Sequence, residues 1–241
     1  MAKVLEKWEV MPHGPLEALD EGLLTVAGDI LMPLGKFPRR MTVVGLAGGR
    51  TAIFSAIALD EPEMQRIEAL GIPSVLIVPG DQHRMDAKIW KQRYPGITVV
   101  APPGAQEAVG SVVAVDSTGD VLGDPLVSYI VVPGVEGHEA ALMVQRPGGA
   151  TLIVNDIIAN VAHPHGLGAH VMARLFGFGV SEPQVPRPVK AKIVKDREAL
   201  AGQFQAWANT PDLKRIIMSH GDPIEKDPRA VLATLAETLL D

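Results

Sequence analysis

Histidine and aspartate side chains gather at the ends of short apolar runs in this sequence. Directly after the run at 74–79, Asp81 and His83 stand two residues apart, and residues at that spacing in an extended chain point the same way. Asp86 follows at the expected start of a helix and can turn its carboxylate to the same point. Imidazole and carboxylate ligands together suit zinc, iron or manganese. The sequence therefore predicts a metal site with the candidate ligands Asp81, His83, Asp86, His138, Asp156 and His220.

Four of the candidate ligands also have an ordinary structural explanation. Asp86 fits the N-cap of a helix, because aspartate there accepts a hydrogen bond from a first-turn amide. Asp156 fits the cap of a turn, His83 fits an ordinary loop histidine, and His220 before a glycine fits the end of a strand. The occurrence of such residues at four separate strand ends favours the metal site over these single explanations.

The other histidines carry less weight. His163 and His165 have the two-residue spacing of a chelating pair, and His170 lies close by. The glycines and prolines around them are typical of a loop, which is the interpretation we prefer for this segment. His13 stands in a Pro/Gly turn and is assigned no role.

The elements that must position these residues are inferred from apolar, β-branched runs bounded by Gly, Pro or Asp. Such runs predict a hairpin across Gly48-Gly49 and further strands along the rest of the chain. The predicted strands cover residues 42–46, 51–57, 74–79, 98–101, 112–116, 127–132, 140–146, 150–155 and 215–219.

Helices are predicted between the strands from their start signals, an aspartate followed by helix-forming residues. They begin after Asp60, Asp86, Asp196 and Asp227. Two stretches of similar make, 42–116 and 127–220, suggest an internally duplicated plan, and the Gly- and Pro-rich stretch 176–188 is expected to be a long loop.

Composition narrows the class of protein. The 241 residues show no compositional shift, so one domain over 1–241 is expected. A net charge of -6 without a basic cluster argues against nucleic acid and anionic membranes as partners. The absence of cysteine excludes thiolate catalysis and Cys-ligated zinc.

The location and partners are also predicted from the sequence. With no signal-peptide pattern and no apolar run of about 18 residues, we expect a cytoplasmic protein. We expect it to act on a small molecule, with a homodimer as the default assembly.

The order of these motifs resembles the metallo-β-lactamase superfamily. Its His-x-His-x-Asp-His motif matches Asp81–Asp86, and its later motifs match Gly137-His138, Asn155-Asp156 and Ser219-His220-Gly221. The stretches FPRRMTVVGL and RYPGITVVAPPG, and the Pro-Gly-x-x-His segment before a Trp-bearing helix, look more specifically like a subfamily with an altered first motif, the DUF4336-like group. The resemblance implies an α/β (α+β) fold, a four-layer αββα sandwich with a metal site at one edge.

The first motif departs from the family at three positions. Asp81 stands where the family has its first histidine, Met85 where it has the aspartate, and Asp86 where it has the last histidine. The resemblance then implies one site made of Asp81, His83 and His138 and another made of Asp86 and His220, bridged by Asp156. Because Met85 cannot act as a base, Asp86 is the candidate catalytic base.

Two functions of different classes follow from this resemblance. The first is a metal-dependent hydrolase of undefined substrate, with zinc as the expected metal and iron or manganese as alternatives. The second is a metal-poor or metal-free family member that binds a ligand or partner without hydrolysis. A di-iron oxidoreductase is disfavoured, because no flavin-type second domain is present in the sequence.

Overall fold

The first of two β-sheets uses the N-terminal part of the chain. The computed structural model describes residues 4–32, 35–161 and 177–241. The strands of this sheet stand in sequence order, with β4, β5 and β6 parallel to one another and the remaining neighbours antiparallel. They are β1 (Glu17–Asp20), β2 (Leu23–Met32), β3 (Gly35–Leu46), β4 (Arg50–Phe54), β5 (Ile72–Ile77) and β6 (Thr98–Val100).

The second sheet packs face to face against the first. Its strands stand in the order β10-β9-β8-β7, and β10 runs parallel to β9. They are β7 (Val127–Val131), β8 (Ala140–Arg146), β9 (Gly149–Val154) and β10 (Leu213–Met218). One buried apolar cluster contains residues of both sheets, which identifies the layer between them; it includes Leu23, Val44, Phe54, Ile77, Leu142, Val144, Ile153 and Ile217.

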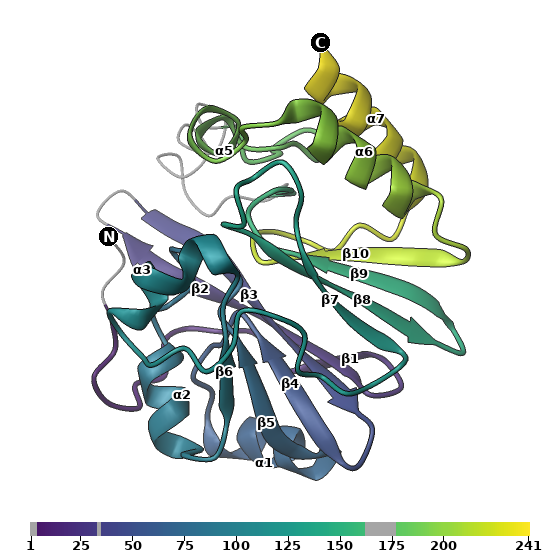
Figure 1. Ribbon diagram of the computed structural model, residues 1–241. Coiled ribbons are helices and arrows are strands. Elements are labelled where there is room, and N and C mark those ends of the chain that lie inside the picture. The colour runs from purple at the N-terminus through teal and green to yellow at the C-terminus, as the bar shows by residue number, and fades with distance from the viewer. Residues whose placement is uncertain (1–3, 33–34, 162–176) are drawn as a thin grey trace.

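Helices cover the outer face of each sheet (Figure 1). The first sheet carries α1 (Glu61–Leu70), α2 (Ala87–Arg93), the 3-10 turn η1 (Pro103–Ala105) and α3 (Gln106–Gly110). The second sheet carries α5 (Arg187–Lys192), α6 (Arg197–Ala208) and α7 (Pro228–Leu240). The layers therefore run helix, sheet, sheet, helix, and the predicted αββα sandwich is confirmed. In the described part of the chain, no helix combines the length and the apolar character needed to cross a membrane.

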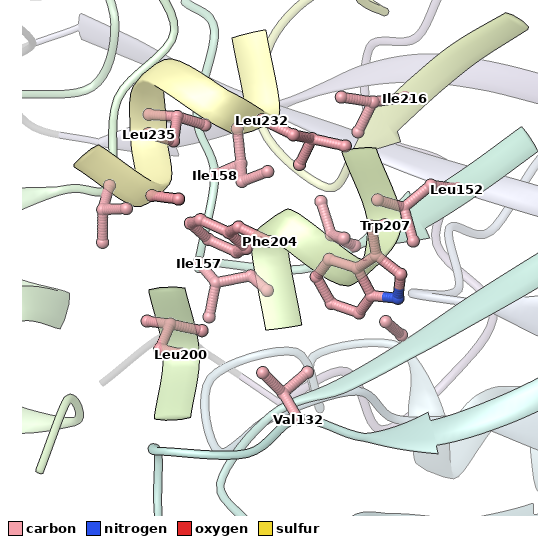
Figure 2. Close-up of a cluster of buried hydrophobic side chains, with 14 of the residues drawn as sticks. Val132, Leu152, Ile157, Ile158, Leu200, Phe204, Trp207, Ile216, Leu232 and Leu235 are labelled. Atoms are coloured by element: carbon pink, nitrogen blue, oxygen red, sulfur yellow. The ribbon is translucent and has the colours of Figure 1, made fainter. Parts of the chain in front are cut away.

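The apolar cluster under α6 and α7 also anchors the chain beside a candidate ligand (Figure 2). Phe204 and Trp207 of α6 pack in this cluster with their ring centroids 5.9 Å apart. Ile157 and Ile158, which follow Asp156 directly, are fully buried in it. Burial of an isoleucine contributes about 1.5–3 kcal/mol, so the two side chains fix the backbone that carries Asp156.

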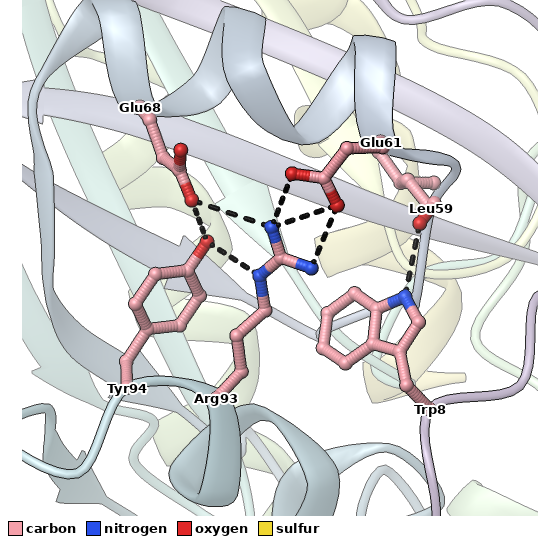
Figure 3. Close-up of polar contacts among 6 residues, drawn as sticks. All are labelled: Trp8, Leu59, Glu61, Glu68, Arg93 and Tyr94. Carbon is pink, nitrogen blue, oxygen red and sulfur yellow. Dashed lines mark hydrogen bonds and ion pairs between the residues drawn. The ribbon is translucent and has the colours of Figure 1, made fainter.

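A polar network holds α2 against α1 and the N-terminal segment (Figure 3). Arg93 of α2 donates to both oxygens of Glu61 and lies over the ring of Trp8, 4.9 Å from its centroid. Tyr94 donates to Glu68, and the Trp8 indole donates to the Leu59 carbonyl. These partly exposed contacts contribute little individually. Together they fix the orientation of α2, whose first turn follows the segment Asp81–Asp86.

The two halves of the chain repeat one pairing pattern. In the first half β3 pairs antiparallel with β4, which pairs parallel with β5. In the second half β8 pairs antiparallel with β9, which pairs parallel with β10. This repeat agrees with the duplicated plan predicted for 42–116 and 127–220. By this repeat, the residues after β4 correspond to those after β9, and the residues after β5 correspond to those after β10.

Most of the predicted elements are confirmed, and the exceptions are local. The predicted strand at 112–116 is wrong, because the amides of Val112 and Val113 donate to the Val109 carbonyl and end helix α3. Strands β1 and β2 were not predicted. Of the loop expected at 176–188, residues 177–186 form a loop, and helix α5 begins at Arg187.

Candidate metal centre

Three residues that follow parallel strands converge at one end of the sandwich. The His83 Nε2 atom lies 3.1 Å from Asp156 Oδ1, and the His220 Nε2 atom lies 3.0 Å from the same oxygen. The two imidazole centroids are 5.0 Å apart. Among the described residues, this is the one group of three whose ligand atoms all lie within 4.8 Å of one another. The first half of the chain supplies His83, and the second half supplies Asp156 and His220.

The other ring nitrogen of each histidine is also hydrogen-bonded. His220 Nδ1 lies 2.7 Å from the Pro38 carbonyl oxygen, and His83 Nδ1 lies 2.9 Å from Ser55 Oγ. A carbonyl oxygen only accepts, so Nδ1 of His220 carries a proton. In neutral His220 a lone pair of Nε2 then faces the Asp156 carboxylate. A cation, either a proton or a metal ion, is needed between them.

The charges of the group reinforce one another. Although burial alone would raise the pKa of Asp156, the imidazoles of His83 and His220 hold it below its usual value. Burial lowers the pKa of His220, but the charge of Asp156 and its hydrogen bond overcome this effect and raise it. The site therefore combines an Asp156 carboxylate that stays ionised with a His220 imidazole at which a bound cation is favoured.

Backbone geometry fixes both histidines. Ser55 adopts a positive φ of 56°, which is uncommon for a residue with a side chain, and its hydroxyl meets His83. Gly221 follows His220 with φ 97°, and a Cβ there would lie 2.0 Å from the Asn160 carbonyl oxygen. Only glycine lets the chain pass Asn160 this closely, so His220 has little freedom to move.

A buried glutamate lies beneath the group. Glu139 is 2% exposed and accepts hydrogen bonds from the Asn155 side chain at 3.2 Å and from the Asp156 amide at 3.0 Å. Burial, reinforced by the charge of Asp156, raises the pKa of Glu139 well above its usual value. Gly80 leaves room for this carboxyl, since a Cβ at 80 would lie 2.8 Å from Glu139 Oε1. Sequence reasoning missed Glu139, although it is adjacent to His138.

Asp81 and His138 form a separate pair. His138 Nδ1 lies 3.3 Å from the Asp81 carboxylate, and each side chain is 34% exposed. Neither residue belongs to the group of His83, Asp156 and His220. The predicted set Asp81, His83 and His138 therefore does not meet at one point: His83 contacts Asp156, whereas His138 contacts Asp81.

Asp86 lies in a buried ion pair. One oxygen pairs with Arg39 Nη1, and the other accepts from the Ala58 amide at 2.9 Å. Asp86 occupies the N-cap position of α2 without a side-chain capping bond. Its carboxylate is 1% exposed, and burial raises its pKa although Arg39 opposes the shift. To serve as a ligand or base, as the sequence predicts, Asp86 would have to leave these partners.

A small cavity adjoins the group. It has a volume of about 120 Å³, and His83, His220, Ser55 and Arg39 line it together with apolar side chains. A larger cavity of about 440 Å³ also has Arg39 in its lining. Neither Arg39 nor Ser55 was singled out from the sequence, because nothing in their local pattern points to chemistry. His163, His165 and His170 lie outside the described residues.

The set of ligand atoms fits a divalent metal ion. Two imidazole nitrogens and one carboxylate oxygen converge, and each histidine is oriented through its second nitrogen, as metal-binding histidines are. Ligand atoms about 2.0–2.1 Å from a tetrahedral zinc lie about 3.3 Å apart, close to the observed 3.0 and 3.1 Å. Three protein ligands leave a position for water or substrate.

Solved structures of metallo-β-lactamases share this fold. FIM-1 from Pseudomonas aeruginosa, in a mono-zinc form, superposes with a TM-score of 0.60 at 15% identity, covering 95% of this chain and 96% of that one. The enzyme from Hirschia baltica gives 0.61 at 10% identity, with 93% and 98% covered. The enzyme from Erythrobacter litoralis gives 0.60 at 17% identity, with 92% and 96% covered.

The fold is thus that of the metallo-β-lactamases over nearly the whole chain. No family model and no curated protein matches the sequence. At identities this low the likeness establishes the fold alone. What the chain does has to be argued from its own residues.

Proposed function

We propose that this protein is a metal-dependent hydrolase in which His83, Asp156 and His220 hold one ion, with zinc as the metal. The observation that carries the proposal is the orientation of His220. Its Nδ1 proton is committed to the Pro38 carbonyl while Nε2 faces the ionised Asp156 at 3.0 Å. A divalent ion between these atoms satisfies both lone pairs at once.

A bound divalent ion would supply an acidified water as nucleophile. The residues around it have distinct parts in the proposal. Asp156 contributes the negative charge, and Ser55 holds the His83 ring through Nδ1. Glu139 accepts a hydrogen bond from the Asp156 amide, and this bond keeps the Asp156 carboxylate directed toward the histidines. The altered first motif leaves Asp86 as a structural partner of Arg39.

The substrate is proposed to be a small molecule. The cavity beside the histidines holds about 120 Å³, which suits a small chemical group rather than a polymer. The net charge of -6 also disfavours nucleic acid and anionic membranes. Membership of the DUF4336-like group, a cytoplasmic location and a homodimer stay predictions from the sequence.

A second candidate is a family member that binds a ligand without hydrolysing it. The observation favouring it is that the first motif contributes a single residue, His83, to the group of three. Asp81 and Asp86 are both paired elsewhere. In this case the cation between His220 and Asp156 is a proton, and the imidazolium form of His220 persists.

Elemental analysis separates the two candidates. The purified protein is incubated with zinc, manganese or iron, passed through a desalting column, and assayed for bound metal. The hydrolase proposal expects about one ion per chain for at least one metal. Metal-loaded protein is then screened with lactam, thioester, lactone and phosphodiester substrates. Less than about 0.2 ion per chain with every metal would refute the proposal.

A further inference from the structure

Ser55, His83 and Asp156 form a continuous hydrogen-bonded chain. The Ser55 Oγ atom lies 2.9 Å from Nδ1 of His83, and Nε2 of the same ring lies 3.1 Å from Asp156 Oδ1. A hydroxyl, an imidazole and a carboxylate in this order are the pattern of a nucleophile, its general base and the group that orients the base. In the metal-hydrolase proposal the Ser55 hydroxyl only holds the ring, so its own reactivity is not used there.

The carboxylate fixes the tautomer of His83 when no metal ion is bound. A carboxylate oxygen only accepts hydrogen bonds. Asp156 stays ionised, because the imidazoles of His83 and His220 outweigh the effect of burial on its pKa. Nε2 of His83 therefore carries the proton of the neutral ring, and Nδ1 has the lone pair. The Ser55 hydroxyl then donates to Nδ1, which is the direction in which its proton has to move for the oxygen to become a nucleophile.

The backbone at Ser55 resembles a nucleophile elbow. Ser55 directly follows strand β4 and has a φ of 56°, a left-handed conformation that is uncommon for a residue with a side chain. In such strand-to-turn elbows the amide of the next residue donates to the oxyanion that forms on the substrate. The amides of Ile57 and Ala58 are bonded to side chains, whereas the Ala56 amide donates to no residue that the structure describes. The Ala56 amide is therefore available for this role.

The reacting groups adjoin the small cavity beside the histidines. Ser55, Ala56 and His83 all line this cavity of about 120 Å³. Gln82, an exposed residue, lines it too, so the cavity extends to the surface of the protein. Since a water molecule occupies about 30 Å³ in the liquid, the space corresponds to roughly four waters. An acyl group of about two or three carbons is of comparable size.

We propose that Ser55 is a nucleophile, and that the metal-free protein transfers a short acyl group from an ester to Ser55 and then to water. The Ser55 oxygen forms a bond to the ester carbonyl carbon while its proton passes to Nδ1 of His83. The bond from this carbon to the alcohol oxygen then breaks, and the leaving alcohol takes the proton. Water removes the acyl group by the same steps, with His83 again as base and then acid. Asp156 is a positioning residue that holds the ring and faces its positive charge.

Metal binding and nucleophilic catalysis exclude each other at His83. An ion at Nε2 replaces the proton there, so the proton of the neutral ring lies on Nδ1. Nδ1 can then donate to the Ser55 hydroxyl but cannot accept its proton. Zinc bound at this site should therefore lower the rate of Ser55 acylation at least about tenfold. The activity itself does not depend on the metal-hydrolase proposal, because it uses the ring in its metal-free form.

Acetylation by p-nitrophenyl acetate tests the proposal. Chelator-treated protein is mixed with the ester, quenched in acid and measured by intact-protein mass spectrometry, and peptide mapping locates the acetyl group. We expect one acetyl group on Ser55, formed together with a burst of p-nitrophenol. Absence of acetylation at Ser55, or acetyl groups on lysine side chains alone, would overturn the proposal.

Three variants assign the parts of the chain. Ser55→Ala should abolish the burst. Asp156→Asn should slow acetylation at least about 100-fold, because an amide no longer holds the required tautomer, and Asp156→Glu should recover part of this loss. An unchanged rate in Asp156→Asn would overturn the positioning role.

Ser219→Ala is the matched control. Ser219 also follows a strand and is 2% exposed, but its hydroxyl has no hydrogen-bond partner among the described residues. Its replacement should change the acetylation rate less than about twofold. Equal losses in Ser55→Ala and Ser219→Ala would overturn the proposal.

Thermal unfolding of each variant guards against loss of the fold. If Ser55→Ala does not fold, peptide mapping of the unaltered protein still decides. Protein that is acetylated at Ser55 but binds no zinc refutes the hydrolase proposal and leaves this one standing. Protein that binds zinc and is acetylated equally with and without it overturns the assignment of Nδ1 as proton acceptor. The two failures are therefore distinguishable.

Discussion

Two aspartates that follow strands in opposite halves of the fold, the buried Asp86 and the partly exposed Asp156, have different electrostatic surroundings. Asp156 faces two imidazoles, and its pKa lies below the usual value. Asp86 faces one guanidinium and one amide, and burial raises its pKa in spite of Arg39. The Asp156 carboxylate faces imidazoles, which can release a proton. The Asp86 carboxylate faces a guanidinium, which stays positively charged.

The comparison shows how the partner of a carboxylate decides whether that carboxylate can take part in binding a metal ion. A carboxylate between histidines can accept a metal ion, because the histidines become ligands when they lose their protons. A carboxylate against arginine has no such freedom, since arginine does not deprotonate. Among the described residues the first half therefore contributes His83 to the group of three, and the second half contributes Asp156 and His220.

The largest effect is expected from removing Asp86. Asp86→Ala leaves Arg39 buried without its counter-charge, which typically costs about 3–5 kcal/mol of the free energy of unfolding. Urea denaturation followed by circular dichroism measures it. Asp81→Ala, at a partly exposed position, is the control and should cost less than about 1 kcal/mol. Similar losses in both variants would contradict the structural role of Asp86.

Asp156→Asn should have its main effect on metal affinity. The amide keeps the shape but loses the charge that two imidazoles share, so we expect the zinc dissociation constant to rise about 100-fold. Competition with a chromogenic chelator measures the change. Asp81→Asn serves as the control and should shift the constant less than about threefold. If the two variants lose affinity equally, the metal lies elsewhere or is shared by both groups.

Variants of the histidines should differ in zinc affinity in the same way, with smaller changes than Asp156→Asn. His83→Ala and His220→Ala each remove a proposed ligand and should weaken zinc binding at least about tenfold. His138→Ala removes a residue paired only with Asp81 in the described structure and should change it less than about threefold. The same chelator competition decides. Strong dependence on His138 would restore the ligand set that the sequence predicts.

The smallest effect concerns the pH dependence of stability without metal. The raised pKa of His220 contributes stability that is present below the unfolded value of about 6.5 and is lost as the pH rises through the folded value. The lowered pKa of Asp156 contributes stability above its unfolded value of 3.8. The raised pKa of Glu139 adds a further loss as the pH rises above 4.5.

The melting temperature of chelator-treated protein should therefore fall as the pH rises above about 6.5, by about 2–4 °C for each kcal/mol of stability lost. Differential scanning calorimetry measures the fall. Glu139→Gln should reduce the fall, because it removes the carboxyl whose pKa is raised. A melting temperature that rises over this range would contradict the charge arrangement described for the site.

The sequence predicted the parts of the fold that depend on local patterns. The Gly48-Gly49 turn between β3 and β4 was found because both glycines adopt positive φ, which few other residues tolerate. Strand β2 was missed, because Gly28 and Asp29 interrupt its apolar pattern, and its pairing with β3 supplies the stability that the local sequence lacks.

The residues of the candidate site divide in the same way, into those marked by a local pattern and those that depend on tertiary packing. His83, Asp156 and His220 were found because each follows a strand, and parallel strands bring their ends together. The roles of Arg39 and Ser55 depend on packing between segments far apart in the chain, so no local signal marks them. Asp81 and Asp86 stay outside the group of three for the same reason, because Asp81 pairs with His138 and Asp86 pairs with Arg39.

The contact of Arg39 with Met85 has an evolutionary consequence. Arg39 Nη1 lies 3.5 Å from the Met85 sulfur as well as pairing with Asp86, so one guanidinium contacts two residues of the segment Asp81–Asp86. An aspartate at 85 alone would compete with Asp86 for Arg39, and a histidine at 86 alone would leave the arginine unpaired. Substitution at 85 or 86 therefore requires linked changes, and residues 39, 85 and 86 should covary among related sequences.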